Sequence, residues 1–144
     1  MVDINKIDGD DVRAIMLKKP EILEKLMGIK INRDTIQTEI WIPCNPGRAK
    51  LDMVFEDIKG IHYTVKIAYK EKLLNAIRHP NVWQWRWCEH NKLPQDKVIP
   101  VLVIEEDAVV NADPKSKAKM EEFAGTTLVV YQYKIEDIAK ELEA

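Results

Sequence analysis

Apolar and polar residues alternate in three successive segments of the chain, a pattern that predicts three β-strands. The segments are TIQTEIWI (35–42), LDMVFED (51–57) and IHYTVKIAY (61–69). A polar turn at Gly60 joins the last two, and Asp52 opens the second strand. Because successive side chains of a strand point to opposite faces, Thr64 and Lys66 share one face of the third strand. The pattern predicts a meander that carries Asp52 and Lys66 on neighbouring strands.

Helical spacing of apolar residues predicts two helices before this meander. Asp10 and Asp11 suit the N-cap of a helix over 12–19, where apolar side chains recur at helical intervals. A second helix is expected after Pro20, and Gly28 stands where a helix commonly ends.

After the meander, helical and apolar segments alternate. Residues 70–93 have helical tendency but contain Pro80, so two helical pieces are expected there. The nearly all-apolar run VIPVLVIEE (98–106) is typical of a strand covered on both faces. A helix over 116–125, a strand over 126–133 and a helix over 134–144 complete the chain. The order αβββαβαβα predicts an α/β fold, a mixed central sheet of about five strands flanked by helices, in a single domain over 1–144.

Composition and charge limit the possible classes of function but do not identify one. With 46% hydrophobic and 32% charged residues, the chain has the composition of a globular protein. Its net charge of -2 gives no overall positive field for nucleic acid. Residues 44–90, however, hold eight Lys or Arg against five Asp or Glu, so this segment is net +3 and the remainder about -5. A surface that faces phosphates is therefore expected in the middle third.

Several other classes of protein are not indicated. Cys44 and Cys88 are far apart in the sequence and lack CxxC spacing, so neither a zinc site nor a disulfide framework is predicted. The acidic start MVDINKIDGDD has no apolar core, and no apolar run reaches membrane-spanning length. The expectation is an intracellular, cytoplasmic protein with no membrane partner.

In this order, the segments KPEILEKLMGI, TEIWIPCNPGRAKLDMVFED, IHYTVKIAYK, VIPVLVIEE and TTLVVYQY resemble the PD-(D/E)XK nuclease superfamily, which has the restriction-endonuclease-like fold. The resemblance covers residues 10–133. It implies that Asp52 is the metal-binding aspartate and that Glu24 is the glutamate commonly found on the first helix. It also implies an Mg²⁺ cofactor in an active member of the superfamily.

The third strand departs from the Glu-x-Lys pattern of this superfamily. In one alignment Thr64 takes the place of the glutamate and Lys66 is kept. In the other, Lys66 takes the place of the glutamate and Ala68 that of the lysine. The alignments differ by two residues, so strand periodicity does not choose between them. Either way the second metal-binding carboxylate is missing, and Glu39 and Glu24 are the candidates to replace it.

Phosphodiester hydrolysis of this kind needs Mg²⁺ held by carboxylates, and a lysine can orient the attacking water or stabilise charge. Asp52 and Glu39 are the predicted metal ligands, and Lys66, Thr64 and Glu24 complete the predicted catalytic set. The predicted nucleic-acid-binding residues are Arg48, Lys50, Lys70, Arg78, Gln84 and Arg86.

Three functions fit these observations. The leading hypothesis is a nucleic-acid-associated protein, acting on DNA rather than RNA, whose hydrolytic activity is weak or lost. The second is an active Mg²⁺-dependent nuclease that uses a substitute carboxylate. The third is a non-catalytic assembly subunit that binds a protein partner or itself through Trp83, Trp85 and Trp87, although core packing is the simplest role for these tryptophans.

Overall fold

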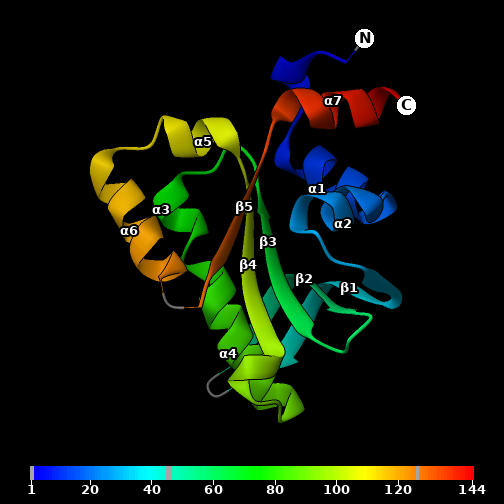
Figure 1. Ribbon diagram of the computed structural model, residues 1–144, viewed down its shortest axis with the longest axis vertical. Coiled ribbons are helices and arrows are strands. Elements are labelled where there is room, and N and C mark those ends of the chain that lie inside the picture. Colours follow the sequence, from blue (N-terminus) through cyan, green and yellow to red (C-terminus); the bar gives the residue numbers. More distant parts are fainter. Residues whose placement is uncertain (1, 45–46, 126) are drawn as a thin grey trace.

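The computed structural model describes residues 2–44, 47–125 and 127–144. A five-stranded sheet in the order β1-β2-β3-β4-β5 runs through its centre (Figure 1). The strands are β1 (Ile31–Pro43), β2 (Arg48–Asp57), β3 (His62–Ala68), β4 (Val98–Glu105) and β5 (Val129–Tyr133). β1, β2 and β3 pair antiparallel, whereas β3, β4 and β5 pair parallel. The predicted mixed α/β sheet is confirmed.

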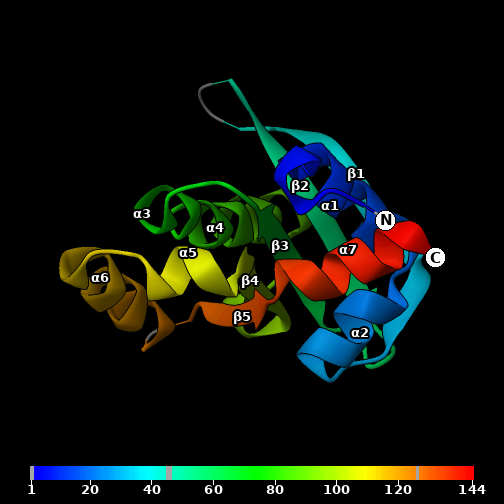
Figure 2. The same cartoon turned by 90° about the horizontal axis from the view of Figure 1, so that it is seen from above.

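Helices cover both faces of this sheet. They are η1 (Ile4–Lys6), α1 (Gly9–Lys18), α2 (Glu21–Met27), α3 (Leu73–Ala76), α4 (His79–Asn91), η2 (Gln95–Lys97), α5 (Glu106–Val110), α6 (Pro114–Ala124) and α7 (Ile135–Glu143). Figure 2 shows α1, α2 and α7 on one side of the sheet and α3, α4, α5 and α6 on the other. Each face therefore has its own apolar core.

The two cores follow from the alternation along β2 and β3. Met53, Phe55 and Val65 are buried on the side of α1, α2 and α7. On the other side, Val54 packs in a cluster with Trp83 and Trp87 of α4. Full burial of one such side chain contributes about 1.5–3 kcal/mol, so the alternating pattern fixes which face each polar neighbour occupies. Thr64 and Lys66 consequently lie on the α4 side.

Helix boundaries agree with the prediction at α2 and differ at α1. α2 ends at Gly28, whose φ of 68° is the left-handed conformation that glycine adopts without strain. The N-cap of α1 is Asp8, and the predicted caps Asp10 and Asp11 are wrong. Asp8 accepts a hydrogen bond from the Asp11 backbone N–H at 2.9 Å, and the Asp11 carboxylate accepts one from the Asp8 N–H at 3.0 Å. This reciprocal capping box places the start of α1 earlier.

The C-terminal half has the predicted elements and one more. The helical segment divides as expected into α3 and α4, with Pro80 in the first turn of α4. β4 is buried along nearly its whole length. The short helix α5 was not predicted, and β5 begins at Val129; residue 126, where the prediction began this strand, lies outside the described residues.

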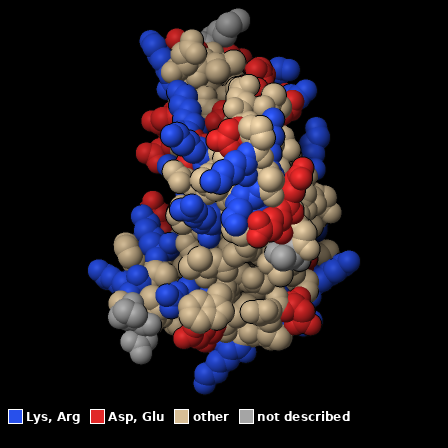
Figure 3. Space-filling model, turned by 90° about the vertical axis from the view of Figure 1, so that its left-hand side faces the viewer, with Lys and Arg blue, Asp and Glu red and all other residues tan. Residues whose placement is uncertain are grey.

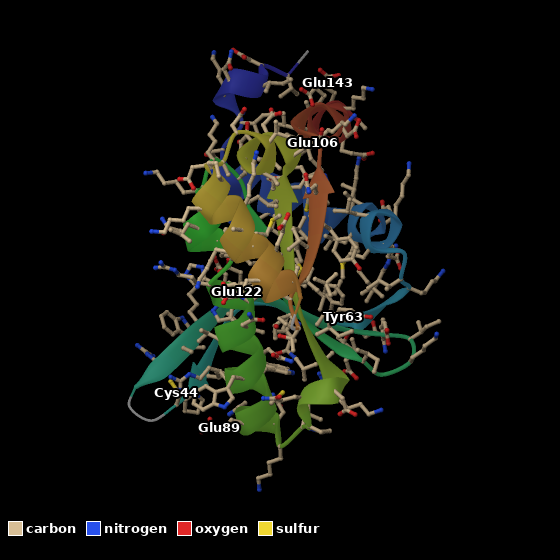
Figure 4. All side chains as sticks on the ribbon, turned by 60° about the vertical axis from the view of Figure 1, so that its left-hand side comes forward. Cys44, Tyr63, Glu89, Glu106, Glu122 and Glu143 are labelled. Carbon is tan, nitrogen blue, oxygen red and sulfur yellow. The ribbon has the colours of Figure 1, made fainter. Side chains whose placement is uncertain are left out.

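The β1–β2 hairpin is longer than predicted and extends beyond the sheet. β3 pairs only with the stretch from Met53 to Glu56, so the first residues of β2 pair with β1 alone. Figure 2 shows the hairpin projecting away from the other strands. Ile42 and Ala49 of the hairpin pack in one cluster with Trp87 of α4, and Figure 4 labels Cys44, which follows β1, and Glu89 on α4. Among the described helices, none is long and apolar enough to cross a bilayer.

Candidate functional site

Asp52 and Lys66 meet across the β2–β3 pair. Met53 is paired with Val65, and continuing this register by one residue sets Lys66 opposite Asp52. The Lys66 Nζ lies 3.5 Å from Asp52 Oδ2 and 3.3 Å from Glu71 Oε2. Only 12% of the Lys66 side chain is exposed, and the two carboxylates are about one quarter exposed. One largely buried ammonium thus stands between two partly exposed carboxylates.

The surroundings hold this ammonium in place. Trp83, buried in α4, lies under it, with 5.9 Å between the Lys66 Nζ and the ring centroid. The negative face of an indole ring attracts a cation, most strongly where water is partly excluded. Asp52, Lys66 and Glu71 together carry a net charge of -1. Lys66 is therefore neutralised by the protein itself.

Glu71 was missed by the sequence analysis. It follows β3, in the turn before α3, so strand alternation does not relate it to Lys66. The preceding Lys70 has a φ of 56°, and its backbone N–H donates to Glu105 Oε1 at 2.7 Å. This left-handed residue reverses the chain, and the reversal is what brings Glu71 back to Lys66. No sequence signal predicts it.

Thr64, a predicted member of the catalytic set, is completely buried under α4. Its hydroxyl donates a hydrogen bond to the backbone carbonyl of Pro80 at 3.3 Å. The side chain therefore fastens the first turn of α4 to β3. Thr64 pairs with Val54, and it is the Lys66 side chain that reaches Asp52.

Glu39 lies near Asp52 but is turned to solvent. It has a φ of 48°, and 78% of its side chain is exposed. Glu39 Oε1 is 3.9 Å from Lys50 Nζ. Glu39 and Asp52 line the same pocket of about 390 Å³ between α1 and the hairpin, together with Asp10 and Arg13. The structure thus brings these two predicted metal ligands to one pocket.

Glu24 is not brought to this pocket. Its carboxylate accepts a hydrogen bond from the Ile31 N–H at 2.9 Å and one from Arg33 at 3.1 Å. The Ile31 hydrogen bond, followed by the Arg33 contact, holds the pKa of Glu24 below its usual value. Ile31 pairs with Asp57, five residues along β2 from Asp52, a separation of about 17 Å at the usual rise of a strand. Glu24 fastens the start of β1 to α2.

These residues do not fit a resident Mg²⁺. Within residues 2–44, 47–125 and 127–144, no three His, Cys, Asp or Glu side chains are grouped so that they could hold a metal ion. Asp52 is already paired with an ammonium at 3.5 Å. A divalent cation about 4 Å from that ammonium would be repelled by about 2–8 kcal/mol, depending on how far water screens the pair.

The predicted nucleic-acid-binding cations lie at two places near α4. Arg48 and Lys50 surround Trp41 on the hairpin, 4.8 Å and 5.8 Å from its ring centroid. Arg86 lies 4.6 Å from the ring centroid of Trp85, and Arg78 is exposed just before α4. Figure 3 shows blue side chains both beside the hairpin end and over the middle of the same side of the molecule.

Two other predicted binding residues are engaged elsewhere. The Gln84 side chain is buried, and its amide donates to the carbonyl of Val98 at 2.8 Å. It therefore joins α4 to β4 and does not face solvent. Lys70 is exposed, but its Nζ lies 3.4 Å from the carbonyl of Asn5, on the side of the N-terminal segment.

The three tryptophans of α4 do not form one surface. Trp83 and Trp87 are one helical turn apart and are buried against the sheet, whereas Trp85 is 50% exposed. The predicted assembly surface through all three is therefore wrong, because the helical period places two of them in the core. Core packing, the simpler interpretation, holds for Trp83 and Trp87.

Two proteins of known structure share the fold of this chain. No protein-family model and no curated protein matches the sequence. A repair endonuclease from Pyrococcus abyssi superposes with a TM-score of 0.61 at 14% identity, over 90% of this chain and 48% of that one. An EndoMS–dsDNA complex gives a TM-score of 0.61 at 16% identity, over 93% and 49%. The chain has the restriction-endonuclease-like fold. It spans about half the length of these two chains, and at this identity the likeness shows the fold alone.

Proposed function

We propose that this protein binds nucleic acid, DNA rather than RNA, and that its phosphodiester-hydrolysing activity is weak or absent. The weak or absent hydrolysis is inferred from the position of Lys66. Its ammonium lies between the carboxylates of Asp52 and Glu71. In a metal-dependent nuclease site of this kind, the carboxylates face a divalent cation that polarises the phosphate. Here an ammonium takes that place, and it neither accepts a phosphate oxygen as a ligand nor activates a water molecule. The degenerate Glu-x-Lys motif is thus accompanied by a changed charge arrangement.

Two observations support the nucleic-acid half. The fold is shared with two proteins of known structure, a repair endonuclease from Pyrococcus abyssi and EndoMS in a complex with dsDNA. The basic side chains lie in the segment whose charge is net +3: Arg48 and Lys50 on the hairpin, Arg78 just before α4 and Arg86 on α4. Cations grouped in this way attract phosphates even when the whole protein is acidic, because screening limits each charge to about 8–10 Å.

A second candidate function is an active nuclease. It is favoured by one observation, that Glu39 lines the same pocket as Asp52. On this hypothesis the exposed Glu39 turns toward Asp52 and supplies the missing carboxylate. Removal of Glu39 would then abolish cleavage as completely as removal of Asp52.

Cleavage and binding assays on one preparation test both halves. Labelled single- and double-stranded DNA is incubated with Mg²⁺ or Mn²⁺ and the wild type, Asp52→Ala or Glu39→Gln. We expect no cleavage above the Asp52→Ala background, together with metal-independent binding that weakens as salt rises. If the wild type cleaves DNA and both Asp52→Ala and Glu39→Gln do not, the first proposal is overturned in favour of the active nuclease. Absence of binding at low salt would overturn the nucleic-acid proposal.

A further inference from the structure

The strand β5 forms one margin of the sheet. Among the described strands it pairs only with β4, in a parallel register that sets Val129 beside Val101 and Tyr133 beside Glu105. Figure 2 shows β5 at the lower edge of the sheet, between α6 and α2. The outward backbone N–H and C=O groups of β5 therefore have no strand to pair with among the described residues. Such a row of groups is a template for a further strand.

The other margin of the sheet, β1, is protected against such pairing, whereas β5 is not. β1 contains the charged residues Arg33, Asp34 and Glu39, and its register with β2 shifts between Asn32 and Gln37. Charges and irregular pairing are two ways in which natural proteins keep a marginal strand from joining a second chain. β5 reads VVYQY, with neither a charge nor a proline, and its five residues are a usual strand length. The unprotected margin is therefore expected to be covered by a partner.

The side chains of β5 suit a second copy of the same strand. Tyr131 and Tyr133 pack on the side of α1, α2 and α7, whereas Val130 packs on the side of α6. If two β5 strands run antiparallel about Tyr131, this residue faces its own copy. Tyr133 then faces Val129, and Gln132 faces Val130. Aromatic pairs and pairs of an aromatic with a β-branched residue stabilise antiparallel strands, and no like charges oppose each other here.

The charges at the two ends of β5 are complementary in this arrangement. Lys134 is exposed directly after β5 and is still extended, with φ -95° and ψ 129°. Antiparallel pairing sets it opposite the partner's Leu128. The Leu128 N–H donates to the Phe123 carbonyl at 3.3 Å, so Leu128 adjoins the last turn of α6, which contains the exposed Glu121 and Glu122. Each copy thus brings a cation to the acidic helix end of the other.

A groove of about 870 Å³ beside β5 also favours a protein partner over nucleic acid. It lies between α2 and α7, and its apolar lining includes Ile22, Leu26 and Ile138. Charged residues of both signs line it as well: Lys25, Lys134, Lys140, Glu21, Glu106, Asp137 and Glu141. Three lysines against four acids give a net charge of -1, which does not attract phosphates. An apolar floor with mixed charges at its rim is typical of a protein interface.

We infer that two copies of this chain pair through β5, antiparallel and across a twofold axis, so that their sheets join into one. A twofold axis brings the same surface of both copies together, which is why β5 has to complement itself. The hairpin that carries Arg48 and Lys50 lies at the other margin of the sheet and stays free for nucleic acid. One short strand makes a small interface, so we expect a weak dimer with a Kd of about 1–100 µM.

Sedimentation velocity of the full chain from about 1 to 300 µM brackets this Kd. Tyr131→Lys sets two ammonium groups opposite each other at the axis and should raise the Kd about tenfold or more. Gln132→Lys adds a charge to β5 at an exposed position, so it keeps the fold even if Tyr131→Lys lowers the melting temperature, and it should raise the Kd about threefold or more. The control is Gln37→Lys, the same change at an exposed position of β1, which should leave the Kd within about twofold. A wild type that stays monomeric at the highest concentration, or a Kd that Gln132→Lys changes no more than Gln37→Lys does, would overturn the dimer.

Cysteine cross-linking tests the register. Tyr131→Cys sets two thiols opposite each other, at the Cα separation of about 4.5–5.5 Å of an antiparallel pair, which a disulfide can span. Val129→Cys sets them four residues apart along the strands, about 13 Å, which a disulfide cannot span. Under oxidation we expect a dimer band on a non-reducing gel for Tyr131→Cys. Val129→Cys should give only the background that Cys44 and Cys88 produce in the wild type. Cross-linking of both variants alike, or of neither, would overturn the antiparallel pairing through β5.

Discussion

The Lys66 ammonium lies 3.5 Å from the Asp52 carboxylate, one residue beyond Met53 and Val65, the last pair between β2 and β3. The same ammonium reaches Glu71 at 3.3 Å, so one lysine balances two acids that belong to different segments. Removing the lysine would leave two half-buried carboxylates close together without a cation. Such an arrangement destabilises the folded state and favours the binding of a metal ion. Lys66 is therefore expected both to stabilise the fold and to keep metal ions from binding Asp52 and Glu71.

Lys66→Met is expected to turn the carboxylates of Asp52 and Glu71 into a weak divalent-cation site. Methionine keeps an apolar stem against Trp83, so the main change is the loss of charge. In metal-free buffer we expect a loss of about 1–3 kcal/mol in unfolding free energy, because two partly solvated acids lose their partner. Millimolar Mn²⁺ or Ca²⁺ should then raise the melting temperature of the variant by about 3 °C or more, and of the wild type by less than about 1 °C.

Lys50→Met is the control for this prediction. Lys50 also faces a carboxylate, Glu39 at 3.9 Å, but both side chains are exposed to solvent. An exposed ion pair of this kind contributes about 0–1 kcal/mol, so the variant should melt close to the wild type with or without metal. If metals stabilise Lys66→Met no more than they stabilise Lys50→Met, then Lys66 does not stand in a cation's place.

The hydrogen bond between Tyr63 and Asp57 is expected to make stability depend on pH. Burial raises the pKa of Asp57, but hydrogen bonds from the Tyr63 hydroxyl at 2.8 Å and from the N–H groups of Ile61 and Lys59 outweigh it. The net result is a pKa below the usual value. Burial, and then the neighbouring Asp57 carboxylate, raise the pKa of Tyr63, so this hydroxyl stays protonated as the donor. The ionised form of Asp57 is thus favoured by folding.

The sign of the effect follows from this lowered pKa. The stabilisation is fully present above the unfolded-state pKa of about 3.9 and is lost as the pH falls through the lower folded-state value. Tyr63→Phe should therefore cost about 1.5–3 kcal/mol at pH 7 and clearly less at pH 2–3, measured by urea unfolding. Tyr133→Phe is the control, since its hydroxyl donates at 2.7 Å to the Ala68 carbonyl, which does not titrate. An equal pH dependence in the two variants would contradict the role of Asp57.

Local patterns predicted most of the fold because its elements follow local rules. Alternation in 51–57 and 61–69 gave the two central strands, and Gly28 marked a helix end by its freedom to adopt a left-handed conformation. The tryptophans of α4 recur every second residue, as in a strand, and only the helix separates Trp85 from the buried pair.

The site was predictable only where both partners lie on paired strands. Asp52 and Lys66 were placed on neighbouring strands by alternation, and they do meet. Glu71 was not predicted because its position depends on the backbone reversal at Lys70, which the sequence does not encode by any turn residue.

Arg48 and Lys50 are expected to set the salt dependence of DNA binding. Each lysine or arginine that neutralises a phosphate contributes about 0.9 to the slope of log affinity against log salt for duplex DNA. Arg48→Gln combined with Lys50→Gln should therefore reduce the slope by about 2 and weaken binding of every sequence alike, as measured by anisotropy between about 50 and 200 mM salt. The control replaces the exposed Lys25 and Lys30, on and after α2, with glutamine and keeps the same net charge. α2 lies on the other side of the sheet from α4 (Figure 2). The salt slope of this control variant should therefore stay at the wild-type value. An equal reduction in both double variants would mean that net charge, and not the hairpin, governs binding.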